Sequence, residues 1–338
     1  MKNEIIQQAL YAKIAELLQT ARQTIVRTVN HAMVYTYYEI GRMIVEEEQA
    51  GSERAAYGKQ TLEEVSAQLM QTFGKGFSIV NLRQMRTFYL RYSIQQKSSA
   101  ELQRPHFQLS WSHYLKLMRI ENPEERRFYE MESAANHWSL KELQRQFDAA
   151  LYERLALSRD KAGIRQLAEK GQIIERPTDM LKDPYILDFL DLPEQHRYSE
   201  NELEQALIDK LEHFLLELGK GFTFVGRQVR FTFNDRHYKV DLVFFNRLLR
   251  CFVVIDLKIG ELSHQDLGQI QMYVHYYDRF VRLPDENKTV GIVLCKDKND
   301  TMVEITLPED NDSIFASRYL TVLPDKQLLI ELLNQEEV

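Results

Sequence analysis

The stretch "YKVDLVFFNRLLRCFVVIDLKIG", residues 238–260, decides the fold of the C-terminal half. Its two apolar runs, "VDLVFF" and "CFVVIDL", predict two buried β-strands, because short apolar segments bounded by polar turns are typical of sheet cores. Each run contains a carboxylate, Asp241 in the first and Asp256 in the second, and Lys258 follows two positions later. Burying an ion costs several kcal/mol unless another group compensates it. The three charges therefore call for a chemical explanation.

The register of the predicted hairpin supplies one. If the hairpin pivots on Leu248 and Leu249, paired residues have a constant sum of numbers, and Asp241 faces Asp256 with β-carbons roughly 5 Å apart. Two like charges at that distance favour a protonated partner or a cation between them, and Mg²⁺ prefers carboxylate oxygens. Lys258 leaves the same face of its strand as Asp256. We therefore predict a metal-dependent hydrolytic centre for a phosphodiester. The alternative is two solvated edge-strand aspartates with Lys258 as a simple ion-pair partner.

The pattern around the hairpin predicts an α/β domain over residues 199–338. The segment "NELEQALIDKLEHFLLELG" has the apolar spacing of one amphipathic helix, and three strand-like segments follow it. Ser263 is the predicted N-cap of a helix over residues 264–281, and "TVGIVLCK" predicts a fourth strand. The resulting order, α-β-β-β-α-β, predicts a mixed sheet flanked by helices.

Residues 1–160 predict a mainly α-helical domain, and residues 161–198 predict a linker because prolines and polar residues gather there. Within the helical part, "TLEEVSAQLMQTF", the glycine-bearing "GKGF" and a helix capped by Ser78 have the spacing of a helix-turn-helix. Residues 74–100 contain no acidic residue, and several of their side chains suit phosphates and base edges. The predicted DNA-binding residues are Lys75, Asn81, Arg83, Arg86 and Arg91. The alternative is a solvated basic face on an ordinary helical bundle.

The composition excludes some classes of protein. The chain has 338 residues, 44% of them hydrophobic, which suffices for two cores. A net charge of −7 argues against nonspecific coating of nucleic acid by the whole surface. The N-terminus is amphipathic and carries acidic residues, unlike a signal or transit peptide, and no apolar run is long enough for a membrane helix. Two cysteines, Cys251 and Cys295, lie in apolar strands, which is typical of reduced thiols in a cytoplasmic protein.

The hairpin resembles the signature of the PD-(D/E)XK nucleases, in which an acid on one strand is followed by acid-X-lysine on the next. Longer segments resemble the YhcG-like family of bacterial PDDEXK proteins, and the resemblance spans roughly residues 15–325. The segments that carry it are "FGKGFSIVNLRQMRTFY", "LSWSHYLKLMRIENPEERRFY", "FLLELGKGFTFVGRQVRF", "RLLRCFVVIDLKIGE" and "GIVLCKDKN". The resemblance implies a restriction-endonuclease-like domain preceded by a helical, DNA-binding N-terminal domain.

The resemblance also implies roles for single residues. Asp241 and Asp256 would be metal ligands, Leu257 would add its backbone carbonyl oxygen, and Lys258 would orient or polarise the nucleophile. The implied cofactor is Mg²⁺, with Mn²⁺ as the alternative ion. This chain departs from the signature in having Val240 in place of proline. It also has aspartate at position 256, where the closest relatives usually have glutamate. The broad signature allows either acid, so we still expect an active enzyme.

Members of the wider fold often place a glutamate on the first core helix, and Glu204 and Glu212 fit that position, with Glu204 preferred. Many related nucleases also have a Q-x-x-x-Y motif on the helix after the lysine. Gln269 and Tyr273 match its spacing, with Gln271 as a rival amide. The alternative for these residues is a polar helix face with a half-buried tyrosine. His237 and His264 lie near the site in sequence, and we assign neither a catalytic role.

Together these features predict a cytoplasmic, divalent-metal-dependent endonuclease that hydrolyses DNA phosphodiester bonds in defence, restriction or DNA processing. The alternative function is a DNA-binding or assembly protein that uses a nuclease fold as a scaffold. The alternative substrates are branched DNA and RNA. The expected partners are DNA, a second copy of the chain and proteins of a restriction-modification or defence system. A homodimer is expected because one active site per chain needs two copies to cut both strands.

Overall fold

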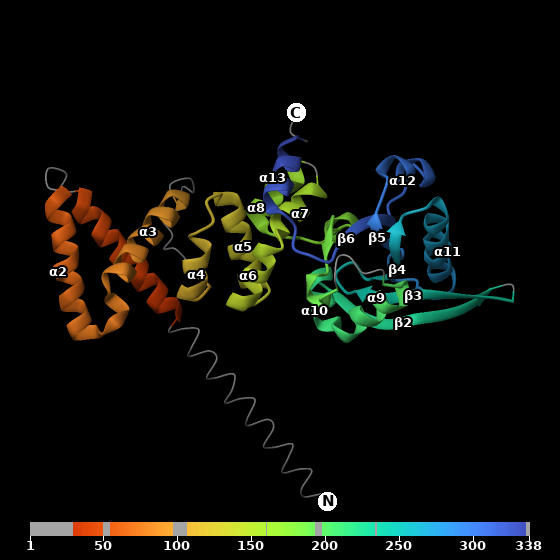
Figure 1. The fold of residues 1–338 in the computed structure, drawn as a ribbon, viewed down its shortest axis with the longest axis horizontal. Coiled ribbons are helices and arrows are strands. Elements are labelled where there is room, and N and C mark those ends of the chain that lie inside the picture. The colour runs from red at the N-terminus through yellow and green to blue at the C-terminus, as the bar shows by residue number, and fades with distance from the viewer. Residues whose placement is uncertain are drawn as a thin grey trace, which may run out of the picture. The chain divides into compact units, whose positions relative to one another are not determined.

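The computed structural model describes residues 30–49, 55–96, 107–159, 161–192, 198–233 and 235–335. The first 29 residues of the predicted helical domain and residues 193–197 of the predicted linker lie outside the described residues. The chain divides into two compact units, Met1–Gln144 and Arg145–Val338 (Figure 1). Each unit is described by itself.

The N-terminal unit is helical throughout the residues that the structure describes, as predicted. Residues 30–49 form its first described helix. The later elements are α2 (Ala55–Phe73), the 3₁₀ helix η1 (Lys75–Phe77), α3 (Ile79–Gln96), α4 (Trp111–Leu117), α5 (Pro123–Ala135) and the start of α6 (Leu140–Asp148). Aromatic side chains dominate the core. Phe88 is fully buried, and its ring centroid lies 4.9 Å from that of Phe107 and 5.0 Å from that of Tyr114.

A helix, a short turn and a second helix follow one another in α2, η1 and α3. Gly74 ends α2 with a φ of +89°, a conformation that glycine adopts without steric cost. Ser66 of α2 donates a hydrogen bond to the carbonyl oxygen of Phe77 at 3.0 Å, which ties the turn to the first helix. The backbone N–H of Asn81 donates to Ser78 Oγ at 3.4 Å, so Ser78 caps α3 as predicted.

The C-terminal unit contains the predicted order α-β-β-β-α-β, with additions. Its elements before the hairpin are α7 (Leu151–Leu157), α8 (Lys161–Lys170), η2 (Pro177–Met180), β1 (Tyr185–Ile186), η3 (Asp188–Leu190), α9 (Glu200–Asp209) and α10 (Leu211–Leu218). The later ones are β2 (Phe222–Phe233), β3 (Arg236–Asn246), β4 (Cys251–Glu261), α11 (His264–Phe280), β5 (Val290–Asp297), α12 (Asp300–Thr306), β6 (Ile314–Leu320) and α13 (Lys326–Gln335).

Several details of this unit differ from the sequence prediction. The helix predicted as one piece after position 200 is two helices, α9 and α10, because Lys210 between them has a φ of −114° and leaves the helical region. Strands β1 and β6 and helix α12 were not predicted. Ser263 does cap α11, and its hydroxyl exchanges hydrogen bonds with Asp266 in a capping box.

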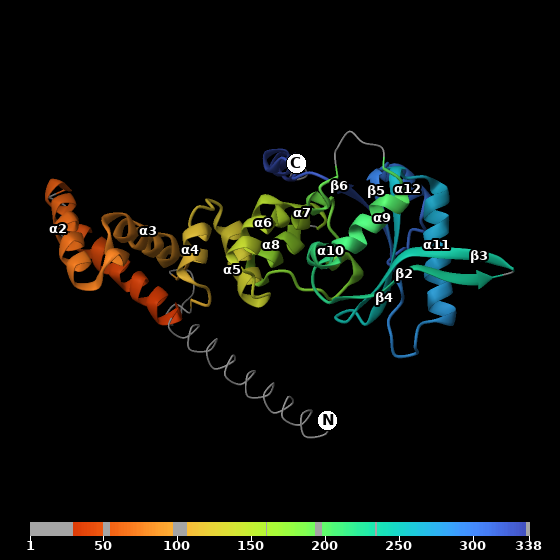
Figure 2. The same cartoon turned by 60° about the horizontal axis from the view of Figure 1, so that its bottom comes forward.

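Six strands form one mixed sheet in the order β1-β6-β5-β4-β3-β2. Strands β2, β3 and β4 are antiparallel neighbours, whereas β4 with β5, β5 with β6 and β6 with β1 pair in parallel. The β2–β3 ladder continues to Phe233 and Arg236, well beyond the point where the β3–β4 ladder ends at Leu242 and Ile255. We call this two-stranded extension, residues 227–233 and 235–241, the hairpin arm. It projects from the sheet in both ribbon views (Figures 1 and 2).

Helices cover both faces of the sheet, so each face has its own core. One face packs against α9 and α10, through Leu203, Leu207, Phe214 and Leu218 against Cys251, Val253, Ile255 and Leu257 of β4. The other face packs against α11, through Leu267, Ile270, Tyr273, Val274 and Tyr277 against Val243, Val254, Val293 and Cys295. Successive residues of β4 point to opposite faces. The even-numbered Asp256 and Lys258 therefore belong to the α11 face.

Residues 161–192 of the predicted linker carry helical and strand segments packed within the C-terminal unit. Strand β1 pairs in parallel with β6, and its two residues, Tyr185 and Ile186, are fully buried. The compact units divide between Gln144 and Arg145. Part of the predicted linker, β1, therefore forms one edge of the six-stranded sheet.

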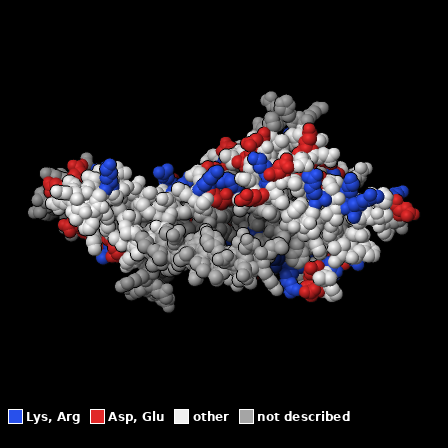
Figure 3. All heavy atoms as spheres, turned by 90° about the horizontal axis from the view of Figure 1, so that it is seen from below, with Lys and Arg blue, Asp and Glu red and all other residues white. Residues whose placement is uncertain are grey.

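The surface and the cysteines agree with the composition. Lys and Arg side chains are interspersed with Asp and Glu on the face shown in Figure 3. Cys251 and Cys295 are free and buried. Among the described helices, none combines the length and the apolar character that crossing a membrane requires.

Candidate active site

The β3–β4 hairpin has the predicted register. The pairs run from Asn246 and Cys251 at the turn to Leu242 and Ile255, where the ladder ends one step before Asp241 and Asp256. Leu248 and Leu249 are poor turn residues by themselves. The side chain of Asn246 compensates, because its Oδ1 accepts hydrogen bonds from the backbone N–H groups of Leu248 at 3.0 Å and Leu249 at 3.2 Å. The two carboxylates lie just past the end of the ladder, close enough for the charge of Asp241 to raise the pKa of Asp256.

Asp256 is the more deeply buried of the two, with 1% of its surface exposed. Burial and, after it, the nearby charge of Asp241 raise its pKa to about 7 against the opposing effect of Lys258. Lys258 Nζ lies 2.9 Å from Asp256 Oδ2, which confirms that the two side chains leave the same face of β4. A site of this kind is short of positive charge, since one cation faces two carboxylates.

Lys258 remains a cation in this setting. Burial lowers its pKa, but Asp256, Glu200 and Asp266 together outweigh burial, so its pKa is raised overall. The Nζ atom lies 3.8 Å from carboxylate oxygens of both Glu200 and Asp266. A lysine with a raised pKa is a donor of hydrogen bonds and positive charge, and a poor proton acceptor at neutral pH.

Asp241 is held by two donors from different elements. Its Oδ2 accepts the backbone N–H of Leu257 at 2.9 Å, and its Oδ1 accepts Gln228 Nε2 at 3.1 Å. The same amide of Gln228 also donates to Glu204 Oε2. Gln228 lies on β2 with a φ of +47°, in the left-handed region. Sequence reasoning missed this residue. Its only signal was an amide placed opposite Asp241 in the β2–β3 register.

Glu204 is therefore linked to the site, and Glu212 is not. Glu204 is 5% exposed on α9, where burial raises its pKa, Gln228 lowers it and Asp241 raises it, with a net increase. Arg227 Nε lies 3.8 Å from Glu204 Oε1. Glu212 is an exposed residue of α10 and has no contact with the site among the described residues. The preference for Glu204 over Glu212 agrees with this geometry.

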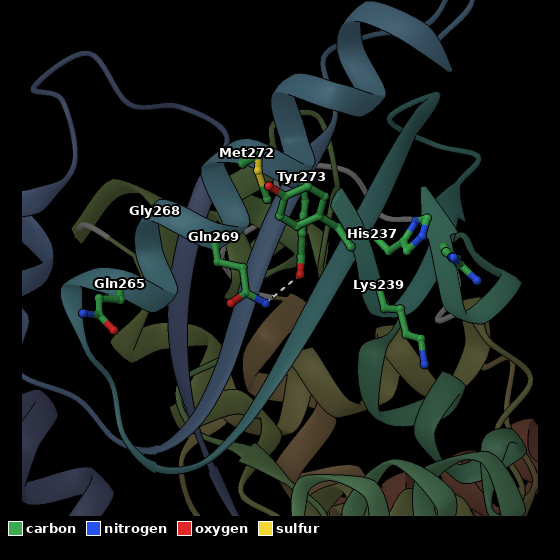
Figure 4. Close-up of a pocket in the computed structure, with 9 residues that line it drawn as sticks. His237, Lys239, Gln265, Gly268, Gln269, Met272 and Tyr273 are labelled. Carbon is green, nitrogen blue, oxygen red and sulfur yellow. Dashed lines mark hydrogen bonds between the residues drawn. The ribbon is translucent and has the colours of Figure 1, made fainter. Parts of the chain in front are cut away.

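The amide and phenol of the α11 motif also reach the site. Gln269 Nε2 lies 3.4 Å from Asp256 Oδ1 and donates to the hydroxyl of Tyr273 at 2.6 Å (Figure 4). Burial and then Asp256 raise the pKa of Tyr273 to about 12, so the phenol stays protonated. Gln271 makes no such contact in the described part of the chain. Tyr273 is almost fully buried, whereas the alternative interpretation expected a half-buried tyrosine.

The donor set suits a hard divalent cation. Carboxylate oxygens are the ligands that Mg²⁺ and Mn²⁺ prefer, and the charge of Asp241 is, after burial, the largest cause that raises the pKa of Asp256. Asp241 and Asp256 are the residues placed to hold such an ion, together with the backbone carbonyl oxygen of Leu257. Within the described residues, no three His, Cys, Asp or Glu side chains already stand in ligand geometry. Here Lys258 and Gln228 contact the carboxylates instead.

The predicted DNA-binding residues of the N-terminal unit differ from one another in exposure and in their contacts. Arg86 Nε forms an ion pair with Glu48 at 2.6 Å, and Asn81 Nδ2 donates to the carbonyl oxygen of Gly76 at 3.0 Å, so both have structural partners. Lys75 is exposed on η1, and Arg91 is partly buried on α3. Arg83 is exposed and lines a pocket of about 320 Å³. The pocket is lined by Val80, Arg83, Gln84, Thr87, Leu115, Met118 and Arg119, so it adds a second arginine that the sequence had not suggested.

The two histidines near the hairpin stay outside this constellation. His237 Nδ1 lies 2.9 Å from Thr232 Oγ1 on the hairpin arm, and His264 is exposed at the start of α11. Neither contacts Asp241, Asp256 or Lys258 in the described part of the molecule.

Comparison with known proteins assigns both halves of the chain. Residues 178–334 match the model of the YhcG PDDEXK nuclease domain, and residues 13–154 match that of the DUF1016 N-terminal domain. A protein of Escherichia coli (strain K12), named YhcG and provisionally described as a nuclease, is 40% identical over 357 aligned positions. The alignment covers 98% of this chain and 95% of the relative.

Two solved endonuclease structures are also similar in part. A repair endonuclease from Pyrococcus abyssi matches with a TM-score of 0.26 and 16% identity, over 37% of this chain and 49% of its own. A structure of EndoMS in complex with double-stranded DNA matches with the same score and identity, over 40% and 50% of the two chains. The chain thus matches about half the length of each of these endonucleases.

Proposed function

The chain belongs to the YhcG PDDEXK nuclease family, and from this premise we propose that it hydrolyses DNA phosphodiester bonds in a divalent-metal-dependent reaction. One observation carries the proposal. Asp241 and Asp256 lie on neighbouring strands just past the end of their ladder, and Lys258 lies 2.9 Å from Asp256. A protein that used the sheet only as a scaffold would gain nothing from three charges in apolar strands, because their burial is costly.

The proposed mechanism gives each side chain one task. Asp241, Asp256 and the carbonyl oxygen of Leu257 would hold Mg²⁺ or Mn²⁺, which when bound supplies Lewis acidity and positive charge at the scissile phosphate. Lys258 stays protonated, so it donates a hydrogen bond to a phosphate oxygen or to the attacking water, and does not abstract a proton. Gln228 would fix the orientation of Asp241.

The supporting residues fit the same scheme. Gln269 contacts Asp256 and Tyr273, so it would orient the second carboxylate through its amide. Glu204 shares the amide of Gln228 with Asp241, which places a third carboxylate beside the site. Residues of this kind act through the metal ligands, and mutations of them commonly cost about 10- to 100-fold in metal affinity or activity.

The biological setting is also a proposal. We place the activity in defence, restriction or DNA processing in the reducing cytoplasm, which the two free thiols support. A second copy of the chain would allow both strands of a duplex to be cut. The N-terminal unit would hold DNA through its exposed basic residues, of which Arg83 and Lys75 are the best placed.

Cleavage assays on plasmid, linear, single-stranded and branched DNA, and on RNA, test the proposal. Wild type should yield products with Mg²⁺ or Mn²⁺ and none with EDTA. Lys258→Ala should lower the rate by about 10²-fold or more, because it removes a donor aimed at developing charge. Lys288→Ala is the matched control, since this lysine is exposed and its nearest carboxylate, on Asp312, is 4.0 Å away.

The same assay separates the nuclease from the scaffold alternative. If wild type cuts no substrate with either metal, and calorimetry detects no metal binding, the nuclease proposal fails. If Lys258→Ala cuts as fast as wild type, the mechanism fails even though the activity stands.

A further inference from the structure

A pocket of about 860 Å³ opens between the hairpin arm and α11. We call it the arm groove. It is lined by Arg230, His237, Tyr238, Lys239, Gln265, Gly268, Gln269, Met272 and Tyr273. Figure 4 shows its two walls, with His237 and Lys239 on the strands and Gln265, Gln269 and Tyr273 on the helix. None of these nine residues is acidic, although the protein as a whole carries a net charge of −7.

The arm groove is continuous with the candidate active site. Gln269 and Tyr273 line the groove, and Gln269 Nε2 also lies 3.4 Å from Asp256 Oδ1. Lys239 lies two residues from Asp241 on the same strand, a distance of roughly 7 Å along it. That length corresponds to about two nucleotides of rise in a DNA duplex. A DNA strand that is cut beside Asp256 would therefore continue into the arm groove.

Two cations face each other across the arm. Arg230 and Lys239 are direct partners in the β2–β3 ladder, and both are exposed. Like charges directly opposite on neighbouring strands destabilise a sheet. In the described part of the chain, neither forms an ion pair with a carboxylate within 4.0 Å. An anion placed between them would relieve the repulsion, and the lining offers amide and imidazole groups around it but no carboxylate.

We propose that the arm groove binds the phosphodiester backbone of DNA beside the scissile phosphate, with Arg230 and Lys239 as the phosphate contacts. The inference rests on the proposed nuclease function and adds the path of the substrate strand. Contacts of this kind position the strand without reading its sequence. Gln265 and Gln269 would add hydrogen bonds to the same backbone.

The test measures DNA affinity in EDTA, so that no cleavage occurs. Fluorescence anisotropy of a labelled duplex and a labelled single strand is followed over a series of KCl concentrations. In the double variant Arg230→Ala with Lys239→Ala, the slope of log K against log [KCl] should fall by about 2 for the duplex, one for each lost phosphate contact. The melting temperature should stay the same or rise, because a like-charge pair is removed.

The control is the double variant Arg279→Ala with Lys288→Ala. It removes two exposed positive charges from the same unit, neither of which lines the groove, so it should keep the slope of wild type. Equal slopes for both double variants and wild type would overturn the inference. That result would leave the proposed function intact as long as wild type cuts DNA and Lys258→Ala does not. Absence of cleavage by wild type would contradict the proposed function. The binding assay would still decide whether the arm groove binds DNA.

Discussion

Gln228 combines an unusual backbone with two contacts at the site. Its φ of +47° lies in the left-handed region, which costs non-glycine residues on the order of 1 kcal/mol or more. Its amide donates to both Glu204 and Asp241. The β2–β3 register shifts between Phe224 and Gly226, shortly before this residue. The strained backbone therefore coincides with the point where β2 supplies a side chain to the candidate active site.

Two substitutions of Gln228 separate the effect of its backbone conformation from the effect of its side-chain amide. Gln228→Gly tolerates the left-handed backbone and removes the amide, so stability should hold while cleavage falls by about 10- to 100-fold. Gln228→Asn is the companion variant, because asparagine also tolerates this region and keeps a shorter amide. Measuring kcat and the melting temperature of both variants checks the prediction. Wild-type kcat in Gln228→Gly would show that the amide has no role at the site.

Asp256 makes the stability of the metal-free protein depend on pH. Its pKa is about 7 in the folded protein against 3.8 as the ordinary value, so the folded state binds more protons between these values. Its contribution is most favourable below about pH 4, declines as the pH rises through 7, and stays low above that. The Asp256→Asn variant has no carboxylate at this position, so its stability lacks this dependence on pH.

Asp256→Asn should therefore abolish cleavage without destabilising the protein above pH 7. Urea unfolding in EDTA, at pH 5 and at pH 8, measures the effect. The difference in unfolding free energy between variant and wild type should shift in favour of the variant by on the order of 2 kcal/mol from pH 5 to pH 8. A variant that is strongly destabilised at pH 8 would mean that the carboxylate has a structural role.

At the scale of elements, the N-terminal unit depends on one close helix contact. The helix of residues 30–49 approaches α3 at Gly41, where a β-carbon would lie 2.1 Å from the carbonyl oxygen of Met85. A backbone atom cannot move aside as the end of a flexible side chain can. Gly41 is thus required by the distance between two helices, and not by its own backbone conformation.

Gly41→Ala should therefore destabilise the N-terminal unit by about 1–3 kcal/mol, the usual cost of overpacking. Gly76→Ala is the matched control, because a β-carbon there meets nothing within 4 Å and Gly76 is not in the left-handed region. Thermal unfolding of the full chain checks both. Equal melting temperatures for Gly41→Ala and wild type would show that the two helices can separate at little cost.

At the scale of the whole molecule, a buried ion pair joins distant parts of the C-terminal unit. Arg154 Nη1 on α7 lies 2.5 Å from Glu217 Oε1 on α10, and both side chains are completely buried. Arg154 also donates to the carbonyl oxygen of Pro184 at 2.9 Å, and Glu217 Oε1 accepts the N–H of Ile186 at 2.9 Å. The pair therefore connects α7 and residues 184–186 to α10.

Arg154→Ala should destabilise the C-terminal unit by about 3–5 kcal/mol, because it removes the cation that contacts the buried carboxylate of Glu217 and leaves only the nearby charge of Lys182. The double variant Arg154→Met with Glu217→Gln should recover much of that loss, since it removes both charges of the pair and keeps an acceptor for Ile186. Urea unfolding of both variants measures the difference. If the single variant were no less stable than the double one, the charge of Lys182 would suffice to compensate Glu217.

Local pattern determined much of this protein. Two apolar runs and a turn centred on Leu248 and Leu249 set the register of the β3–β4 hairpin, which ends one step before Asp241 and Asp256, and period two put Lys258 on the same face as Asp256. These relations extend over neighbouring residues of a single hairpin, so a sequence contains them directly. The helical character of the N-terminal half and the caps at Ser78 and Ser263 follow from equally short-range rules.

Only the tertiary structure decided which distant residues join that hairpin. The choice of Glu204 over Glu212, the amide of Gln228, and the pairing of β1 with β6 all depend on how separate elements pack, and no local periodicity specifies such contacts. The arm groove arises in the same way, from α11 crossing beside two strands. The sequence by itself determined the hairpin with its three charged residues. Packing decided which polar groups of other elements contact these charges, because a buried polar group must form hydrogen bonds with whatever residues surround it.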